Sequence, residues 1–202
     1  MKLYFSPGAC SLSPHIALRE AGIPFELVKV DLRAKKTADG RDFTTVNPKG
    51  SVPALELDDG QVLTEGPAIV QYIADLNPAA NIAPKAGSME RVRLQEWLNY
   101  LTSEVHKTFG SLFAPNMPEE WKKVVMGNVE KRMDYLSKAL DGKQFLMGDQ
   151  FTVAEGYLFT LLGWTRFFNV DLNRWPVLAA YAGRCCMRPK VLEAMKAEGM
   201  GG

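Results

Sequence analysis

The sequence predicts a small α/β domain followed by a larger all-helical domain. Strand and helix signals alternate over roughly the first eighty residues, whereas only helical signals follow a linker rich in proline and alanine. The 202 residues fit one large or two small domains at ~150 residues per domain, and a compact chain of this mass buries about 70% of its surface. We therefore expect domains over residues 1–77 and 88–202, joined by a linker over 78–87.

The N-terminal domain combines strand signals with two helix signals. Strands are expected over residues 2–5, 25–30, 52–57 and 61–63, and helices over 11–21 and 65–76. Gly22 ends the first helix, and Pro67 lies in the first turn of the second, where its missing N–H leaves no hydrogen bond unmade. The first helix is a crossover between parallel strands, whereas Asp58-Asp59-Gly60 is a hairpin signal. We therefore expect a mixed four-stranded sheet.

The second domain is expected to contain helices and no strand. The helices are expected over residues 88–113, 118–140, 152–168, 175–186 and 189–198. Ser88 and Pro118 are residue types that begin helices. Thr152 and Glu155 have the spacing of a capping box, in which the two residues satisfy each other's backbone N–H groups.

Composition and charge argue against several classes of function. The 24 Lys and Arg residues nearly balance 23 Asp and Glu residues, so the net charge is +1 and a nucleic-acid partner has no electrostatic support. No apolar stretch approaches the ~20 residues that cross a bilayer, and the N-terminus lacks the apolar region of a signal peptide. We therefore expect a cytoplasmic protein without a membrane partner. Three cysteines and two histidines, without metal-ligand spacing, predict neither a metal site nor a disulfide framework.

Cys10 is a candidate for chemistry because it lies in the turn between the first strand and the first helix. The unpaired N–H groups and the dipole at a helix N-terminus stabilise a thiolate, so we expect the pKa of Cys10 to be lowered. Thioredoxin-like domains place reactive sulfur at this turn. Position 13 is serine, so Cys10 would act through a mixed disulfide or by stabilising another thiolate. The alternative is an inert, buried thiol.

Two further segments of the N-terminal domain have features of a peptide-binding edge. Pro53 opens a strand, and in a thioredoxin-like arrangement such a proline is cis, which leaves the backbone of Val52 free to pair with an extended ligand. Glu65 precedes a helix whose first N–H groups can hold a carboxylate, while its own side chain can accept from an ammonium group. The alternatives are an ordinary trans proline and a helix-capping acid.

These segments match a known pattern. Ser6-Pro7-Gly8-Ala9-Cys10-Ser11, Val52-Pro53-Ala54-Leu55 and Glu65-Gly66 together resemble the bacterial beta class of cytosolic glutathione transferases. The resemblance implies a thioredoxin-like N-terminal domain and an all-helical C-terminal domain. It also implies glutathione contacts from Cys10 at the sulfur, Val52 and Pro53 at the cysteinyl part, Glu65 and Gly66 at the γ-glutamyl end, and Lys35 at the glycyl carboxylate. Gly66 departs from the serine or threonine usual in the wider family, so a hydroxyl donor is lost.

The first helix of the second domain adds polar candidates. Asn99, Ser103 and His106 lie at i, i+4 and i+7, which places them on one polar stripe of the helix. The stripe could line a cleft between the domains, with His106 beside a sulfur atom, but spacing alone favours a solvated helix face. The resemblance instead implies contacts to glutathione, with Asn99 and Ser103 supplied by a neighbouring subunit. The implied residues are Asn99, Ser103, Glu104, Val105, His106 and Lys107.

Three other aromatic residues and a second histidine have two interpretations each. Trp164, Phe167 and Phe168 could edge a hydrophobic acceptor site, although aromatic residues at this spacing more often belong to a core. His15 lies among apolar residues of the first helix, which favours a structural role over a ligand role.

Three hypotheses of function follow. In the first, a homodimeric glutathione transferase uses glutathione as its co-substrate and no metal. The glutathione thiolate attacks an electrophilic carbon of a hydrophobic compound, in detoxification or degradation, with Cys10 and His106 as catalytic residues. In the second, Cys10 is itself the nucleophile and passes through a mixed disulfide with glutathione, giving thiol-disulfide exchange or reductive dehalogenation. In the third, the protein carries glutathione and apolar ligands without turnover.

Overall fold

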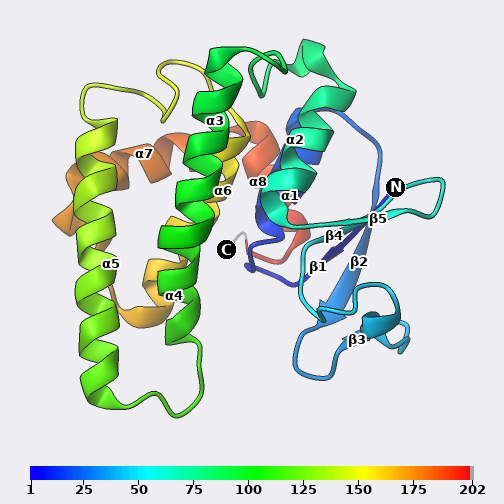
Figure 1. The fold of residues 1–202 in the computed structure, drawn as a ribbon, viewed down its shortest axis with the longest axis horizontal. Helices are drawn as coiled ribbons and strands as arrows, with labels where there is room; N and C mark the ends of the chain where they lie inside the picture. The colour runs from blue at the N-terminus through cyan, green and yellow to red at the C-terminus, as the bar shows by residue number, and fades with distance from the viewer. Residues whose placement is uncertain (201–202) are drawn as a thin grey trace.

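The structure is a computed structural model that describes residues 1–200, and it places a sheet domain beside a helical domain (Figure 1). The strands are β1 (Lys2–Phe5), β2 (Glu26–Asp31), β3 (Lys36–Thr37), β4 (Ala54–Glu56) and β5 (Val62–Thr64). They form a mixed sheet in the order β3-β2-β1-β4-β5, in which β1 pairs parallel with β2 and antiparallel with β4. The prediction of a thioredoxin-like sheet with both parallel and antiparallel strands is therefore confirmed.

The sheet has five strands, and the prediction of four was wrong. The additional strand, β3, lies in the polar connector after β2 and pairs with it only through Val30 with Thr37 and Asp31 with Lys36. A strand of two residues is too short to show an alternating pattern of apolar residues, so periodicity cannot reveal it.

The two faces of the sheet are covered differently. Helices α1 (Leu12–Glu20) and α2 (Gly66–Leu76) lie against one face, where Leu3 and Leu55 of the sheet join the main apolar core. On the other face Tyr4 packs against Phe43, with ring centroids 5.5 Å apart, in a smaller core. Alternate residues of β1 thus point to opposite faces, as the pleat of a strand requires.

The second domain contains the helices that were expected, with one change. These are α3 (Met89–Tyr100), α4 (Lys107–Leu112), α5 (Glu119–Leu140), α6 (Val153–Gly163), α7 (Pro176–Cys186) and α8 (Pro189–Ala197). The helix expected over 88–113 is interrupted by a π-helical turn over Leu101–His106, which connects α3 to α4 in one continuous rod beside α5 (Figure 1). Residues Trp164–Phe168 continue α6 as a 3₁₀ turn. No helix within residues 1–200 combines the length and the apolar character needed to cross a bilayer.

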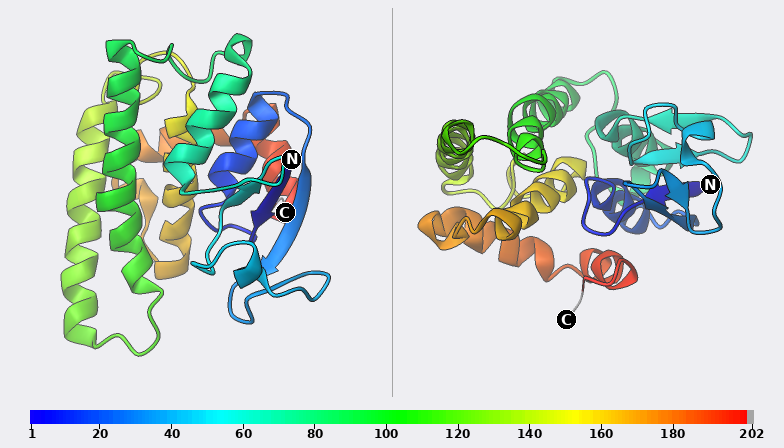
Figure 2. Two further views of the ribbon diagram at one scale, coloured as in Figure 1. Left: turned by 45° about the vertical axis from the view of Figure 1, so that its right-hand side comes forward. Right: turned by 90° about the horizontal axis from the view of Figure 1, so that it is seen from below.

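Helix α1 joins the two domains, because it packs on the sheet and also against α6 and α8 (Figure 2). Gly156 of α6 allows the close approach, since a Cβ there would lie 3.3 Å from Ile16 Cγ2 and 3.7 Å from the Ser13 carbonyl oxygen. The capping box at the start of α6 is confirmed: Thr152 accepts from the backbone of Ala154, and Glu155 accepts from the backbone of Thr152 at 2.9 Å. The core is therefore continuous from the sheet into the helical domain.

Candidate functional site

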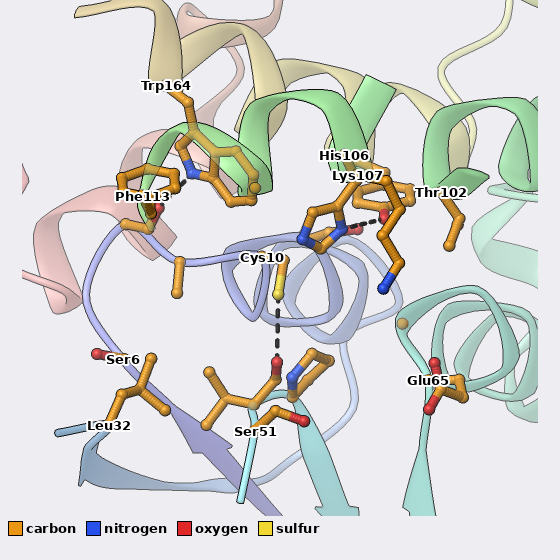
Figure 3. A pocket seen from close by; sticks show the side chains of 18 of the residues that line it. Ser6, Cys10, Leu32, Ser51, Glu65, Thr102, His106, Lys107, Phe113 and Trp164 are labelled. Carbon is orange, nitrogen blue, oxygen red and sulfur yellow. Dashed lines mark hydrogen bonds between the residues drawn. The ribbon is translucent and has the colours of Figure 1, made fainter. Parts of the chain in front are cut away.

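A cavity of about 1010 Å³ lies between the loops at the ends of the strands and the helices of the second domain (Figure 3). The sequence-predicted residues that line it are Cys10, Val52, Pro53, Glu65, Gly66, His106 and Lys107. The cavity therefore brings together candidates from both domains, which lie between 40 and 97 positions apart in the sequence.

The loop before Cys10 is held by the helical domain. The N–H group of Gly8 donates to the Glu198 carboxylate at 2.9 Å, and the Gly8 carbonyl accepts from the indole N–H of Trp164 at 2.9 Å. Gly8 has φ of +69°, a conformation that a residue with a Cβ rarely adopts. The N–H and the carbonyl of Gly8 are thus both held by side chains of the helical domain, which fixes the backbone of this loop.

His15 belongs to the same structural network, as its apolar neighbours in the sequence favoured. Its side chain is fully buried, its Nδ1 lies 2.8 Å from Glu198 Oε1, and its Nε2 accepts from Arg19 Nε at 2.9 Å. His15 does not line the cavity. It orients Glu198, which in turn holds Gly8.

Cys10 lies at the start of α1 and lines the cavity, but its thiol is not activated in the ligand-free protein. The thiol donates to the Val52 carbonyl oxygen at 3.2 Å. Burial raises the pKa of Cys10 to about 12 and outweighs the nearby backbone N–H groups of Cys10 and Ser11, which lower it. The expectation of a lowered pKa was therefore wrong, because it considered the helix terminus and not the desolvation of the sulfur.

The peptide bond between Val52 and Pro53 is cis, as the thioredoxin-like arrangement predicts. Strand β4 begins at Ala54, so Val52 lies just outside the ladder and beside Cys10. Its backbone borders the cavity at the edge where an extended peptide could pair.

Glu65 immediately precedes α2 and adopts a left-handed φ of +68°. Its carboxylate pairs with Lys49 Nζ at 2.6 Å, and the same ammonium group donates to Thr64 Oγ1 at 2.8 Å. Gly66 follows, and a Cβ there would lie 4.0 Å from Pro53 Cγ, so the absence of a side chain is not forced by crowding. Lys49 also lines the cavity, and no motif distinguishes it from its neighbours in the Asn47-Pro48-Lys49-Gly50 turn.

His106 ends the π-helical turn and points into the cavity above Cys10 (Figure 3). Its Nδ1 lies 2.6 Å from the Tyr157 hydroxyl oxygen, and its ring packs edge-on against Trp164 with centroids 4.9 Å apart. Burial, and to a smaller extent the charge of Lys107, lowers the pKa of His106 to about 4. The imidazole is therefore neutral at physiological pH.

Five predicted residues do not line the cavity: Lys35, Asn99, Ser103, Glu104 and Val105. Val105 is fully buried in the core, so its predicted contact is not formed by its side chain. Glu104 forms an ion pair with Arg132 of α5, with 2.7 Å between Glu104 Oε2 and Arg132 Nη2. Asn99 and Ser103 are exposed on the rod formed by α3 and α4.

The polar stripe separates because the π-helical turn has more residues per turn than an α-helix. The stripe at i, i+4 and i+7 assumed 100° per residue throughout, and of its three residues only His106 reaches the cavity. Such turns within α-helices are frequently found at functional sites.

The second wall of the cavity is aromatic. Phe113 packs edge-on against Trp164 and Phe167, with ring centroids 5.5 Å and 6.0 Å away, and Phe113 and Phe167 are about half exposed. Trp164 and Phe167 therefore border the cavity, whereas Phe168 packs against Phe113 from outside it. Sequence reasoning missed Phe113 and Tyr157, because neither lies in a motif. Within residues 1–200, no three His, Cys, Asp or Glu side chains are grouped to hold a metal ion.

Comparison with known proteins agrees with this arrangement. The family described as glutathione S-transferase, N-terminal domain, matches residues 8–76, and glutathione S-transferase, C-terminal domain, matches residues 100–189. The chain is 46% identical over 200 residues to glutathione S-transferase GstA of Escherichia coli O157:H7, covering 99% of this chain and 100% of that protein.

Solved structures give the same result. A sphingomonad glutathione S-transferase complexed with glutathione has a TM-score of 0.96 and 52% identity, over 99% of this chain and 100% of that one. The bacterial beta-class enzyme of Sphingomonas chungbukensis has a TM-score of 0.96 and 50% identity, over the same shares of the two chains. Fold, full-length identity and both domain matches show that the chain belongs to the glutathione S-transferase family, and within it to the bacterial beta class.

Proposed function

We propose that this protein is a glutathione transferase that joins the sulfur of glutathione to electrophilic carbons of hydrophobic compounds. The observation that carries the proposal is the order of chemical groups along one cavity. Cys10 and His106 lie between Glu65 on one side and Phe113 and Trp164 on the other (Figure 3). The charged end of glutathione would bind at Glu65, its sulfur would lie at Cys10 and His106, and the acceptor would stack on the aromatic side.

The γ-glutamyl end of glutathione carries an ammonium group and a carboxylate. Glu65 would accept from the ammonium group in place of Lys49, and this exchange costs little because the Lys49–Glu65 pair is more than half exposed. The first N–H groups of α2, at Gly66, would hold the carboxylate. For the glycyl carboxylate we keep Lys35, which lies outside the cavity but whose Nζ donates at 2.7 Å to the carbonyl of Gly50, between the cavity-lining residues Lys49 and Ser51.

The reacting sulfur would lie beside Val52, whose backbone would pair with the cysteinyl part of glutathione. His106 is neutral and can donate to the sulfur, which favours the thiolate over the thiol. The glutathione thiol releases its proton to water, and the electron pair of the resulting thiolate forms the carbon–sulfur bond. A halide leaves with its bonding pair when the acceptor is a halide, and a neighbouring carbon takes a proton when the acceptor is a conjugated double bond.

A second copy of the chain is part of the proposal. Asn99 and Ser103 are exposed outside the cavity of their own chain, and Met89 and Val92 of the same helix are 65% and 50% exposed. A homodimer would cover this face and bring Asn99 and Ser103 to the partner's site. We also propose a cytoplasmic location.

Glutathione binding and turnover test the proposal. We expect the protein to bind glutathione in calorimetry and to conjugate it to a chloronitrobenzene. Glu65→Gln should raise the KM for glutathione about tenfold, because a charged hydrogen bond is lost, with a smaller effect on kcat. Glu26→Gln, on the exposed edge of β2, is the matched control. Turnover at the uncatalysed rate with intact binding would instead establish a carrier.

One observation favours thiol-disulfide exchange as a second activity: the Cys10 sulfur borders the same cavity. A Cys10 thiolate would attack the glutathione sulfur of a mixed disulfide and release the other thiol. A second glutathione thiolate would then release oxidised glutathione and regenerate Cys10. In Cys10→Ala, loss of disulfide reduction with retained conjugation would support two activities, and loss of both would make Cys10 the activator of the sulfur.

A further inference from the structure

We propose that Tyr157 is a positioning residue that fixes the tautomer of His106, so that the imidazole presents an Nε2–H donor to the cavity. The contact between the two side chains is short, at 2.6 Å between the Tyr157 hydroxyl oxygen and His106 Nδ1. Both residues line the cavity, and they come from different helices, Tyr157 from α6 and His106 from the end of the π-helical turn.

The direction of this hydrogen bond follows from the protonation of its partners. Burial raises the pKa of Tyr157 above its ordinary value, so the phenol keeps its proton. Burial also lowers the pKa of His106 to about 4, so the imidazole carries one proton and has one free nitrogen. A phenol is a good donor and a poor acceptor, whereas an unprotonated imidazole nitrogen is a good acceptor. Tyr157 therefore donates to Nδ1, and the proton of His106 lies on Nε2.

The ring cannot turn to exchange its two nitrogens without losing its packing. The Tyr157 ring lies edge-on at 5.9 Å and Trp164 edge-on at 4.9 Å from the imidazole centroid. A Cβ at Gly110 would lie 3.9 Å from His106 Cδ2, which places the backbone of α4 beside a third edge. The Nε2–H group is left as the polar group of His106 that can face the sulfur of a bound substrate (Figure 3).

His15 provides an internal reference, because the chain has two histidines. Arg19 Nε donates to His15 Nε2 at 2.9 Å, so the proton of His15 lies on Nδ1 and faces Glu198 at 2.8 Å. The two histidines are therefore opposite tautomers in the same molecule.

Nitrogen NMR of the imidazoles in the full-length protein, without glutathione, tests the assignment directly. We expect an Nε2–H tautomer for His106 and an Nδ1–H tautomer for His15. In Tyr157→Phe the His106 signals should move toward a mixture of tautomers while those of His15 stay unchanged. Tyr181→Phe removes another buried phenol, one that donates to the Glu155 carbonyl away from the cavity, and should change neither histidine. An Nδ1–H tautomer for His106 in the unsubstituted protein overturns the proposal, whatever the stability of the variants.

The catalytic consequence rests on the proposed function and has its own test. Tyr157→Phe should lower kcat/KM for conjugation roughly fivefold, the effect of one hydrogen bond. In a His106→Gln background, where the amide donates without help from a phenol, adding Tyr157→Phe should change kcat/KM less than about twofold. Two effects that multiply would show that Tyr157 does not act through His106. If no variant and no unsubstituted protein turns over glutathione, the proposed function fails while the tautomer assignment is judged by NMR alone.

Discussion

Burial affects the pKa of individual side chains in this cavity more than helix dipoles do. Cys10 and His106 both lose water, and burial moves the pKa of the thiol up to about 12 and that of the imidazole down to about 4. Both shifts favour the neutral form. Cys10 and His106 therefore both line the cavity as neutral hydrogen-bonding groups.

Alkylation should report the state of Cys10. In ligand-free protein its modification rate should rise about tenfold per pH unit up to pH 10 without a plateau, because the thiolate fraction rises that way below the pKa. Mass spectrometry of peptides labelled with iodoacetamide measures this rate for each cysteine. A plateau near neutral pH would show an activated thiolate and contradict the raised pKa.

His106 should make the fold sensitive to acid. Its pKa is about 4 when folded and 6.5 in the unfolded reference, so the unfolded chain binds the proton first as the pH falls. The free energy of unfolding therefore falls as the pH drops from 6.5 to 4, by about 3 kcal/mol. Urea unfolding should show that His106→Gln loses less stability over this range than the unsubstituted protein. Parallel pH curves for the two proteins would contradict the shift.

At the scale of single elements, local sequence rules identified most boundaries and missed the irregular ones. The capping box at Thr152 follows from a short motif whose physics is local, whereas the cis bond before Pro53 was expected only from the thioredoxin-like arrangement. The π-helical turn over Leu101–His106 has no such signature, because it depends on how the rod packs between α5 and α6. For the same reason the hydrogen bond between His106 and Tyr157 could not be predicted: the two residues are 51 positions apart.

The capping box should contribute measurably to stability. Thr152→Ala removes the hydroxyl that satisfies a backbone N–H at the start of α6, and should lower the free energy of unfolding by about 1–2 kcal/mol. Thr152→Ser keeps the hydroxyl and is the control, and urea denaturation measures both. Because α6 also carries Tyr157, glutathione turnover of both variants should be followed below their unfolding transitions.

At the scale of the whole molecule, the two domains share one apolar core. Helix α1 packs on the sheet and on α6 and α8, and its Leu12 and Ile16 are almost fully buried in the core that the two domains share. The order of strands and helices along the chain predicted two domains, but the extent of this shared core depends on contacts that periodicity does not locate. The raised pKa of Cys10 was unpredictable for the same reason.

The N-terminal domain alone should therefore fail to fold cooperatively. A chain of residues 1–77 exposes the face of α1 that α6 and α8 cover. A domain of this size buries a small apolar core and is only marginally stable even when that core is complete. We expect no sharp urea transition by circular dichroism, whereas the full chain should show one. A sharp transition in the isolated domain would contradict this dependence.

The hydrogen bonds that hold Gly8 affect the order in which the site can form during protein synthesis. The two groups that fix its peptide, Trp164 and Glu198, follow it in the chain by 156 and 190 residues. During synthesis the sheet and α1 emerge first, but the loop beside Cys10 can acquire its final shape only after residue 198 has been added and α8 has docked. Cys10 is therefore translated well before Trp164 and Glu198, and the loop beside it is completed only when α8 has been made.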